Sequence, residues 1–250
     1  MHWSRLVLSA FFVIVVFATR SFAEDIDEIW DPFEPVNRLV FKLNDGSYTY
    51  ILKPIAESYD VVVPDTVQTG ISNFFSNIGY PIYLVSDVIQ LKFTQAAQHT
   101  ARFALNSTLG IAGLVDVAKD LELEHHEEDF GTALGFWGVP HGPYIVIPFL
   151  GMSTLRDAVG LSVDGLLLDP LSYNRYFNVL SANEDTFLTL VTTSLEAVNG
   201  LVGNIKAIEA ARQASVDYYL FAQGAYYQHR ENLVTDGEMS DDEFLDDFSE

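Results

Sequence analysis

Apolar residues recur at helical spacing through most of this 250-residue chain. A helix buries one stripe of its surface, so apolar residues three and four positions apart indicate helices, and proline and glycine mark their limits. On this pattern we predict helices over Asp65–Asn77, from Pro81 through residue 92, from Phe93 to before Gly110, and over Ser153–Leu168, Glu184–Asn199 and Asn204–Arg230. We therefore predict a mainly α-helical fold.

The middle of the chain departs from this pattern. Between Gly131 and Gly151 it holds eight glycines and prolines, a density that breaks regular helices. Tyr144–Ile147 is either a short strand or a buried extended stretch, because periodicity does not separate the two. We predict a single helical domain that contains this Gly/Pro-rich central segment.

The N-terminus has the pattern of an export signal. Arg5 precedes the apolar run of residues 6–18, which is short for a membrane span and typical of a signal-peptide core. Small residues at Ser21 and Ala23 predict cleavage after Ala23. An uncleaved signal anchor is the alternative, and either way the body is exported. No later stretch is long and apolar enough to predict a spanning helix.

Composition divides the rest of the chain into three parts. Residues 24–30 form an acidic leader, residues 31–232 form the helical body, and residues 233–250 form a tail without Lys or Arg. An acidic tail of this kind is usually solvated and disordered.

The formal net charge of −22 limits the kinds of molecule that this chain can bind. Binding to nucleic acid or to anionic head groups needs clustered Lys and Arg, so we expect neither, whereas a basic partner protein would be attracted. The chain has no cysteine, which excludes disulfides, thiolate metal sites and cysteine nucleophiles. Because the chain is strongly acidic, any contact with a membrane must use apolar surface rather than attraction to anionic head groups.

The sequence holds no pattern typical of an enzyme. There is no nucleophile elbow, no P-loop and no dinucleotide glycine pattern, so we predict neither catalysis nor a cofactor. The acidic stretch of residues 124–129 contains His125 and His126, but adjacent histidines fit a metal site poorly. A solvated acidic loop is the favoured interpretation, and His141 between Pro140 and Gly142 suits a turn.

Four blocks resemble one family in the same order along the chain. They are DPFEPVNR (residues 31–38), ISNFFSNI (71–78), RFALNSTLGIAGLVDVA (102–118) and EDFGTALGFWGVPHGPYIVIPFLGMSTLRD (128–157), with a weaker match at YYQHREN (226–232). On these blocks the body resembles the MlaA (VacJ) family over about residues 31–232.

The resemblance implies a function that composition does not show. The family's fold is a ring of helices in the inner leaflet of the outer membrane, with an amphipathic channel that opens to the periplasm. It associates with a trimeric porin, passes phospholipid to a soluble periplasmic carrier and maintains lipid asymmetry. The resemblance thus implies that this chain removes mislocalised phospholipid from the outer leaflet. Many members carry acyl chains on a cysteine, and this sequence has none.

Transport of a phospholipid needs an apolar path for the tails and a polar one for the head group. Exposing about 30 methylenes to water would cost on the order of 20 kcal/mol. The segment Leu105–Val117 suits an apolar hairpin, in which Gly110 and Gly113 allow tight bends and Leu109 and Leu114 present apolar surface. The resemblance places a gate-like hairpin near here. A helix end followed by a core turn is the equally weighted alternative.

Several polar residues interrupt the apolar helical stretches. They are candidates for lining a channel or touching a head group: Asn37, Arg38, Asn44, Asn73 and Asn77. The favoured alternative is that they cap or cross-link helices through hydrogen bonds, and Arg38 is spaced to pair with Glu34. The large side chains of Phe74, Phe75, Phe136 and Trp137 either face lipid at the interface or, more commonly, pack in the core.

The acidic tail carries apolar residues that suit a partner's groove. Phe244 and Phe248 are four residues apart, with Leu245 between them, so one helical turn would place both aromatic rings on one side. We hypothesise that this tail docks the periplasmic carrier, against the alternative of a solubilising tail.

The competing functions are a soluble periplasmic phospholipid carrier, a phospholipase and a porin accessory, and all three rank below membrane-embedded translocation.

Overall fold

The computed structural model describes residues 29–165 and 185–237, with side chains described throughout except at 185–190. The predicted signal peptide, leader residues 24–28 and tail residues 238–250 lie outside the described residues. Within them, no helix combines the length and apolarity needed to cross a membrane.

The first wall of the molecule is a long helix with a widened joint. It consists of α2 (Glu34–Ser47), the π-helical turn η1 (Tyr48–Leu52) and α3 (Lys53–Val62). Pro54 has no N–H to give to the carbonyl of Tyr50, and at this point the N–H of Lys53 donates to the carbonyl of Tyr48, five residues back. The π-helical turn therefore joins α2 to α3 without ending the helix.

A pair of antiparallel helices follows. These are α4 (Asp65–Ile89) and α5 (Phe93–Thr108), joined by a turn in which Leu91 has φ of 62°. We predicted two helices where α4 is one, because Gly79 and Pro81 looked like a stop and a new start. The structure keeps Pro81 inside the helix, with Asn77 and Tyr80 before it and Asp87 after it all buried. Packing against α5 thus outweighs the local cost of the proline.

The central segment forms a short helix and a hairpin. After α6 (Val117–Asp120) and α7 (Phe130–Phe136), strands β1 (Tyr144–Ile147) and β2 (Gly151–Thr154) pair antiparallel, with Tyr144 opposite Thr154 and Ile147 opposite Gly151. The extended stretch over 144–147 is therefore a strand. Helix α8 (Leu155–Val163) begins two residues later than predicted, because Ser153 belongs to β2 and the Thr154 side chain caps α8.

The last two helices are divided at a different place from the predicted one. α10 (Asp185–Ala214) runs unbroken through Gly200 and Gly203, and α11 (Tyr218–Val234) follows it. The break lies at Asp217, whose side chain accepts the N–H groups of Tyr219 and Leu220 as an N-cap. The Asp217 side chain satisfies backbone N–H groups that would otherwise lack an acceptor, and this defines the start of α11. Gly200 and Gly203, by contrast, do not end α10.

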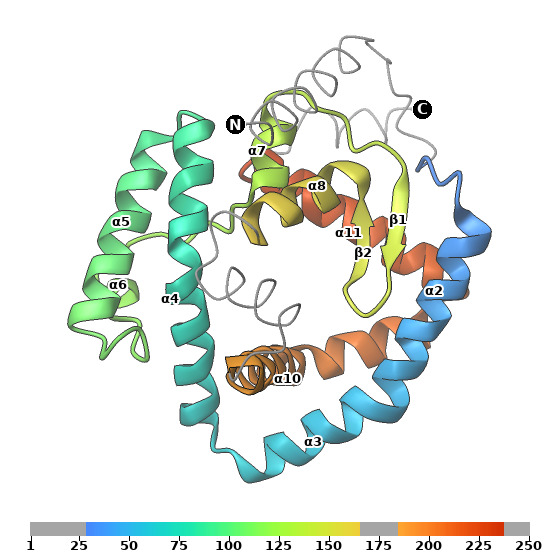
Figure 1. The fold of residues 1–250 in the computed structure, drawn as a ribbon, viewed down its shortest axis with the longest axis horizontal. Helices are drawn as coiled ribbons and strands as arrows, with labels where there is room; N and C mark the ends of the chain where they lie inside the picture. Colours follow the sequence, from blue (N-terminus) through green and yellow to red (C-terminus); the bar gives the residue numbers. More distant parts are fainter. Residues whose placement is uncertain (1–28, 166–184, 238–250) are drawn as a thin grey trace.

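These elements follow one another around a closed circuit (Figure 1). The wall of α2, η1 and α3 passes along the right and lower sides, α4 and α5 stand on the left, and α7 and α8 lie at the top. The circuit closes where Asn37 of α2 donates to the carbonyl of Tyr144 in β1 at 2.9 Å and accepts the N–H of Val146 at 2.9 Å.

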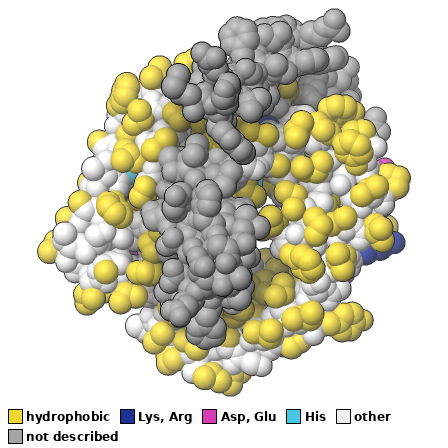
Figure 2. Space-filling model, in the orientation of Figure 1, with side chains coloured by type: hydrophobic (Ala, Val, Ile, Leu, Met, Phe, Trp, Pro, Cys, Tyr) yellow, Lys and Arg dark blue, Asp and Glu magenta, His cyan; other side chains and the backbone are white. Residues whose placement is uncertain are grey.

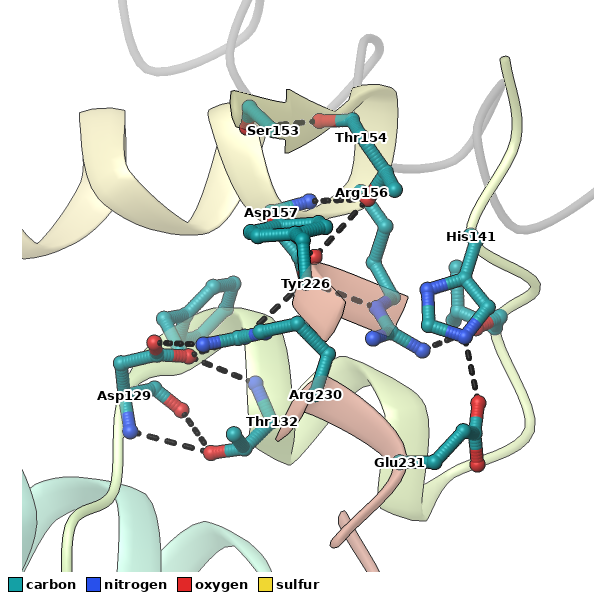
Figure 3. Close-up of polar contacts among 12 residues, drawn as sticks. Asp129, Thr132, His141, Ser153, Thr154, Arg156, Asp157, Tyr226, Arg230 and Glu231 are labelled. Carbon is teal, nitrogen blue, oxygen red and sulfur yellow. Dashed lines mark hydrogen bonds and ion pairs between the residues drawn. The ribbon is translucent and has the colours of Figure 1, made fainter. Parts of the chain in front are cut away.

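A buried charge network joins α7, α8 and α11 (Figure 3). The guanidinium of Arg230 contacts both oxygens of Asp129 at 2.6 and 2.9 Å and one oxygen of Asp157 at 3.0 Å. The Nε of Arg156 donates to the same Asp157 at 3.0 Å, and the hydroxyl of Tyr226 donates to its other oxygen at 2.7 Å. Burial alone would raise the pKa of Asp157, but the two arginines and the Tyr226 hydrogen bond outweigh it, and the pKa is lowered.

We expect Arg230→Ala to destabilise the fold by about 3–5 kcal/mol, because it leaves Asp129 without its cation and the buried Asp157 with only one of its two arginines. The matched control is Arg38→Ala, which removes a more exposed arginine paired with Glu34 and Asp217 and should cost about 1 kcal/mol or less. Urea unfolding in mild detergent measures both. Equal losses in the two variants would contradict the role given to the network.

Acidification should remove part of this stability. A carboxyl group with a lowered pKa contributes stability above its unfolded value, here 3.8, and loses it as the pH falls further. Tyr226→Phe deletes one interaction that lowers the pKa of Asp157, so its deficit relative to wild type should be full at pH 7 and shrink below pH 3.8. Tyr59→Phe, whose hydroxyl donates to the Asn199 amide, is the control with a deficit that does not change over this range.

Candidate functional site

Few of the large apolar side chains in the described part of this protein are fully buried, and many are exposed. Among the described residues, the buried apolar side chains are alanines, tyrosines and one valine, with no buried leucine, isoleucine or phenylalanine. Many charged and amide side chains are buried instead. A water-soluble domain usually buries its large aliphatic residues, so this distribution is suited to an apolar surrounding. Figure 2 shows hydrophobic side chains spread over one face, with few charged ones among them.

The clearest exposed apolar surface runs along the first wall. We call it the apolar belt, and it comprises Val36, Leu39, Leu43, Tyr50, Ile51, Ile55, Val61 and Val62. Leu39 and Leu43 are 69% and 50% exposed and lie one turn apart on α2. Fully burying a side chain of this size is worth roughly 1.5–3 kcal/mol, so the belt favours contact with an apolar medium.

The opposite face of α2 is polar and faces the hairpin. Asn37 is fully used by Asp31 and by the backbone of β1. Asn44 donates to the carbonyl of Ile147, the last residue of β1, at 3.0 Å and accepts the N–H of Phe149, within the hairpin turn, at 2.8 Å. The two amides are seven residues apart and therefore lie on one helix face. α2 thus has an apolar face outward and a hydrogen-bonding face inward.

Arg38 occupies a partly exposed position between α2 and α11. Its Nε donates to Glu34 at 2.7 Å, in the predicted one-turn pairing, and its Nη1 lies 2.9 Å from Asp217. The guanidinium also lies over the ring of Tyr219, 4.4 Å from the centroid. The hydrogen bond to Glu34 is the main cause that raises the pKa of Arg38.

The second group of predicted site residues meets at the far end of α4 and α5. After α5 the chain makes an exposed apolar turn over Leu109–Val115, which we call the distal loop. Asn73 donates to the carbonyl of Leu114 at 3.2 Å, and Asn77 donates to the hydroxyl of Ser107 at 2.9 Å. The structure therefore places Asn73 and Asn77 against the distal loop.

Two glycines allow the distal loop to fold this tightly. A Cβ on Gly110 would lie 2.1 Å from the carbonyl oxygen of Val115 and 2.6 Å from that of Asn106. Gly113 has φ of +93°, and a Cβ there would lie 2.6 Å from the Cβ of Asn77. Leu109 and Leu114 remain 66% and 43% exposed, so the loop presents the apolar surface expected from the sequence.

The predicted site residues therefore form two separate groups. Asn37, Arg38 and Asn44 lie with the hairpin and α11, while Asn73 and the distal loop lie across the molecule in Figure 1. Phe74 is half-buried beside Phe75, their ring centroids 5.5 Å apart. The tail residues Phe244, Leu245 and Phe248 lie outside the described residues. A role for any of these residues in a channel, a gate or a dock stays a prediction.

Most of the histidines in the described part of the chain have structural partners rather than a shared ion site. In the described ranges no group of three or more His, Cys, Asp or Glu side chains is placed to hold an ion. Burial, with Arg102 nearby, lowers the pKa of His125. His141 bonds through Nε2 to Glu231 of α11, so it links the segment before β1 to that helix.

Sequence reasoning missed the buried polar partners. The dyad of Asp87 and His99 joins α4 and α5 at 2.6 Å with both side chains fully buried. Arg102 donates to Tyr80 at 2.6 Å and to Asp116 at 2.7 Å. The available signal was a charged residue inside an apolar helical stretch, but its partner lies too far along the chain to be identified by spacing.

Comparisons with known proteins agree on one family. The family described as MlaA lipoprotein matches residues 29–233. The intermembrane phospholipid transport system lipoprotein MlaA of Escherichia coli K12 is 31% identical over 225 residues, which cover 85% of this chain and 82% of that protein. The Haemophilus influenzae protein of the same name is 28% identical over 226 residues, covering 89% and 86% of the two chains.

Another bacterial protein and a solved structure are also similar to this chain. An uncharacterized protein of Rickettsia felis is 33% identical over 200 residues, covering 76% of this chain and 80% of that one. A solved structure described as the structural basis for maintenance of bacterial outer membrane lipid asymmetry superposes with a TM-score of 0.68 at 32% identity. It covers 82% of this chain and 98% of that chain.

Gly110→Ala tests the packing of the distal loop. The added methyl group must displace backbone oxygens, so we expect a loss of about 1–3 kcal/mol in the free energy of unfolding. Gly46→Ala in α2 is the matched control, because its Cβ would meet nothing within 4 Å and should stabilise the helix by roughly 0.5–1 kcal/mol. A neutral Gly110→Ala in thermal or denaturant unfolding would show that the loop relaxes freely.

Proposed function

This chain belongs to the MlaA lipoprotein family, and from that membership we propose that it removes mislocalised phospholipid from the outer membrane and hands it to a soluble periplasmic carrier. The family is one of intermembrane phospholipid transport and outer-membrane lipid asymmetry, and it is not a family of enzymes. Removal from the outer leaflet and delivery to a carrier are the finer steps that we propose for this chain.

The outward placement of the large apolar side chains is the observation that carries the proposal. A helix such as α2, apolar outside and hydrogen-bonded inside, is stable where its outer face meets acyl chains. Exposing a lipid tail to water costs about 0.8 kcal/mol per methylene. A transporter embedded in the membrane can take up a lipid without exposing its tails to water.

The circuit of helices supports an amphipathic passage. In our proposal the closed wall of Figure 1 is the ring inferred from the resemblance, and the two groups of site residues line or gate the passage through it. In our proposal the partly exposed Arg38 would accompany the head group, while Asn37 and Asn44 would hold the hairpin that lines the passage. The distal loop, with Leu109 and Leu114 exposed beside Asn73, would offer apolar surface to the tails.

The apolar belt also supports a proposal about where in the cell the protein resides. We propose residence at the periplasmic face of the outer membrane, with the apolar belt in the inner leaflet and a trimeric porin as neighbour. The curated relatives are named lipoproteins, and this sequence contains no cysteine. In our proposal the belt contributes to retention on the membrane, and the acidic tail around Phe244 and Phe248 contributes to capture of the carrier.

Fractionation of the native host tests this function. We expect the wild-type protein in the outer membrane, where it should co-purify with phospholipid and a porin in mild detergent. Leu39→Asp puts a charge on the belt and should move a large share of the protein to the soluble periplasm. Leu121→Asp is the matched control, because Leu121 is 57% exposed outside the belt.

Two outcomes would count against the proposal. A wild-type protein that is soluble and carries stoichiometric phospholipid would be a carrier rather than a translocation component. A wild-type protein that is soluble and holds neither lipid nor porin would remove the case for transport by this chain.

A further inference from the structure

Residues 121–129, which we call the linker, connect α6 to α7 and run across α4 and α5 (Figure 1). Both ends of the linker are fixed. At its start the N–H of Leu123 donates to the carbonyl of Ala118 at 3.2 Å, and near its end the buried Glu128 pairs with Lys92 at 2.8 Å. The function proposed above makes no use of the residues between these two points.

The middle of the linker is held by a histidine that acts as a hydrogen-bond acceptor. His99 of α5 is fully buried, and its Nδ1 lies 2.6 Å from a carboxylate oxygen of Asp87 in α4. Nε2 of the same ring accepts the backbone N–H of His126 at 3.4 Å. A protonated imidazole has two donors and no acceptor, whereas the neutral ring has one of each. The contact with the linker therefore requires a neutral His99.

A second histidine acceptor lies one residue earlier in the linker. The ring of His125 packs edge-on against Tyr80 of α4, with the ring centroids 5.6 Å apart. Nε of Arg102 donates to the Tyr80 hydroxyl at 2.6 Å, so the hydroxyl hydrogen is directed to Nδ1 of His125, 3.5 Å away. Protonation of His125 would replace this acceptor by a donor and place a positive charge beside Arg102.

Acid acts against the contacts between the linker and the two helices. The charged and titratable groups that face the two histidines from the helices are Asp87, Tyr80, Tyr83, Arg102 and Asp116. Burial is the main cause that lowers the pKa of His125, and the charge of Arg102 lowers it further, against the opposite effect of Glu127. Since the ordinary pKa of histidine is 6.5, protons favour departure of the linker as the pH falls below 6.5.

An open groove of about 440 Å³ lies on the other side of the linker, between it and the end of α11. The charged and titratable groups that line it are His125, His126 and Glu127 from the linker and His229 and Asp236 from the far wall. His125 is exposed here although one side of its ring packs on Tyr80, so water and protons reach it directly. The groove also provides the space into which the middle of the linker can move.

We propose that the linker is a proton-sensitive latch between the pair α4–α5 and the rest of the fold. It stays against the pair while His99 and His125 are neutral. Protonation of His125 removes the Tyr80 contact, the His126 N–H then leaves His99, and residues 123–127 move into the groove while the two ends stay fixed. Acid thereby loosens the connection of α4 and α5, which carry the distal loop, to α7.

Hydrogen exchange of the full-length protein in mild detergent tests the latch. After correction for intrinsic exchange rates, we expect the protection of the linker amides to fall about tenfold or more between about pH 7.5 and about pH 5. The amides of α7 and α8 should keep their protection over this range, because the pKa of Asp157, which joins them to α11, is below 3.8.

Two histidine variants separate the sensor from its surroundings. His125→Asn keeps an oxygen acceptor near the position of Nδ1 but takes up no proton, so its linker should stay protected at about pH 5. His229→Asn is the matched control, because it removes a histidine from the far wall of the same groove and should leave the pH response unchanged. Tyr80→Phe removes the donor to His125, so the linker should be less protected at about pH 7.5 and respond less to acid.

A spin label on the linker measures its movement directly. Since the chain contains no cysteine, Glu124→Cys provides a single attachment site at an exposed position. The label should become more mobile between about pH 7.5 and about pH 5, and it should not do so when His125→Asn is added. Circular dichroism at both pH values checks that each variant keeps its helices.

Four results would overturn the latch. Equal linker protection at the two pH values would exclude a proton-sensitive contact. An undiminished response in His125→Asn would exclude His125 as the sensor, and loss of the response in His229→Asn would assign it to the far wall of the groove. An equal loss of protection in α7, α8 and α11 would show a general loosening by acid instead of movement of the linker.

Discussion

The pairing of Arg230 with Asp129 and Asp157 is the interaction on which the rest of the fold depends, because it ties α11 to α7 and α8 from the middle of the chain. Such a network is needed here for a physical reason. Where large aliphatic side chains face outward, little apolar area remains to hold the interior together, and hydrogen bonds and ion pairs must define which elements meet. The dyad of Asp87 and His99 does the same for α4 and α5.

The hydrogen-bonded interior affects how the stability of the fold depends on the medium, water or lipid, around the protein. Buried charges are costly unless they are paired, but a satisfied network keeps its geometry whether water or lipid lies outside the wall. α2 shows both requirements in one helix, since Asn37 and Asn44 bond the hairpin while Leu39 and Leu43 face away from it. An apolar exterior with a hydrogen-bonded interior is what the proposed function requires, because a protein embedded in lipid that passes a lipid with a charged head group needs both kinds of surface.

The sequence by itself determined the helical class, the start and end of α5, the likeness of residues 31–232 to one family and the apolar character of the distal loop. These follow from periodicity, from glycine and proline, and from motifs within a few residues of one another. Only the tertiary structure decided that α4 continues through Pro81, that α10 continues through Gly200 and Gly203, and that Asn37 and Asn44 serve the hairpin. The partners of these residues lie elsewhere along the chain, more than a hundred residues away for the two asparagines, and local pattern carries no information about contacts at that separation.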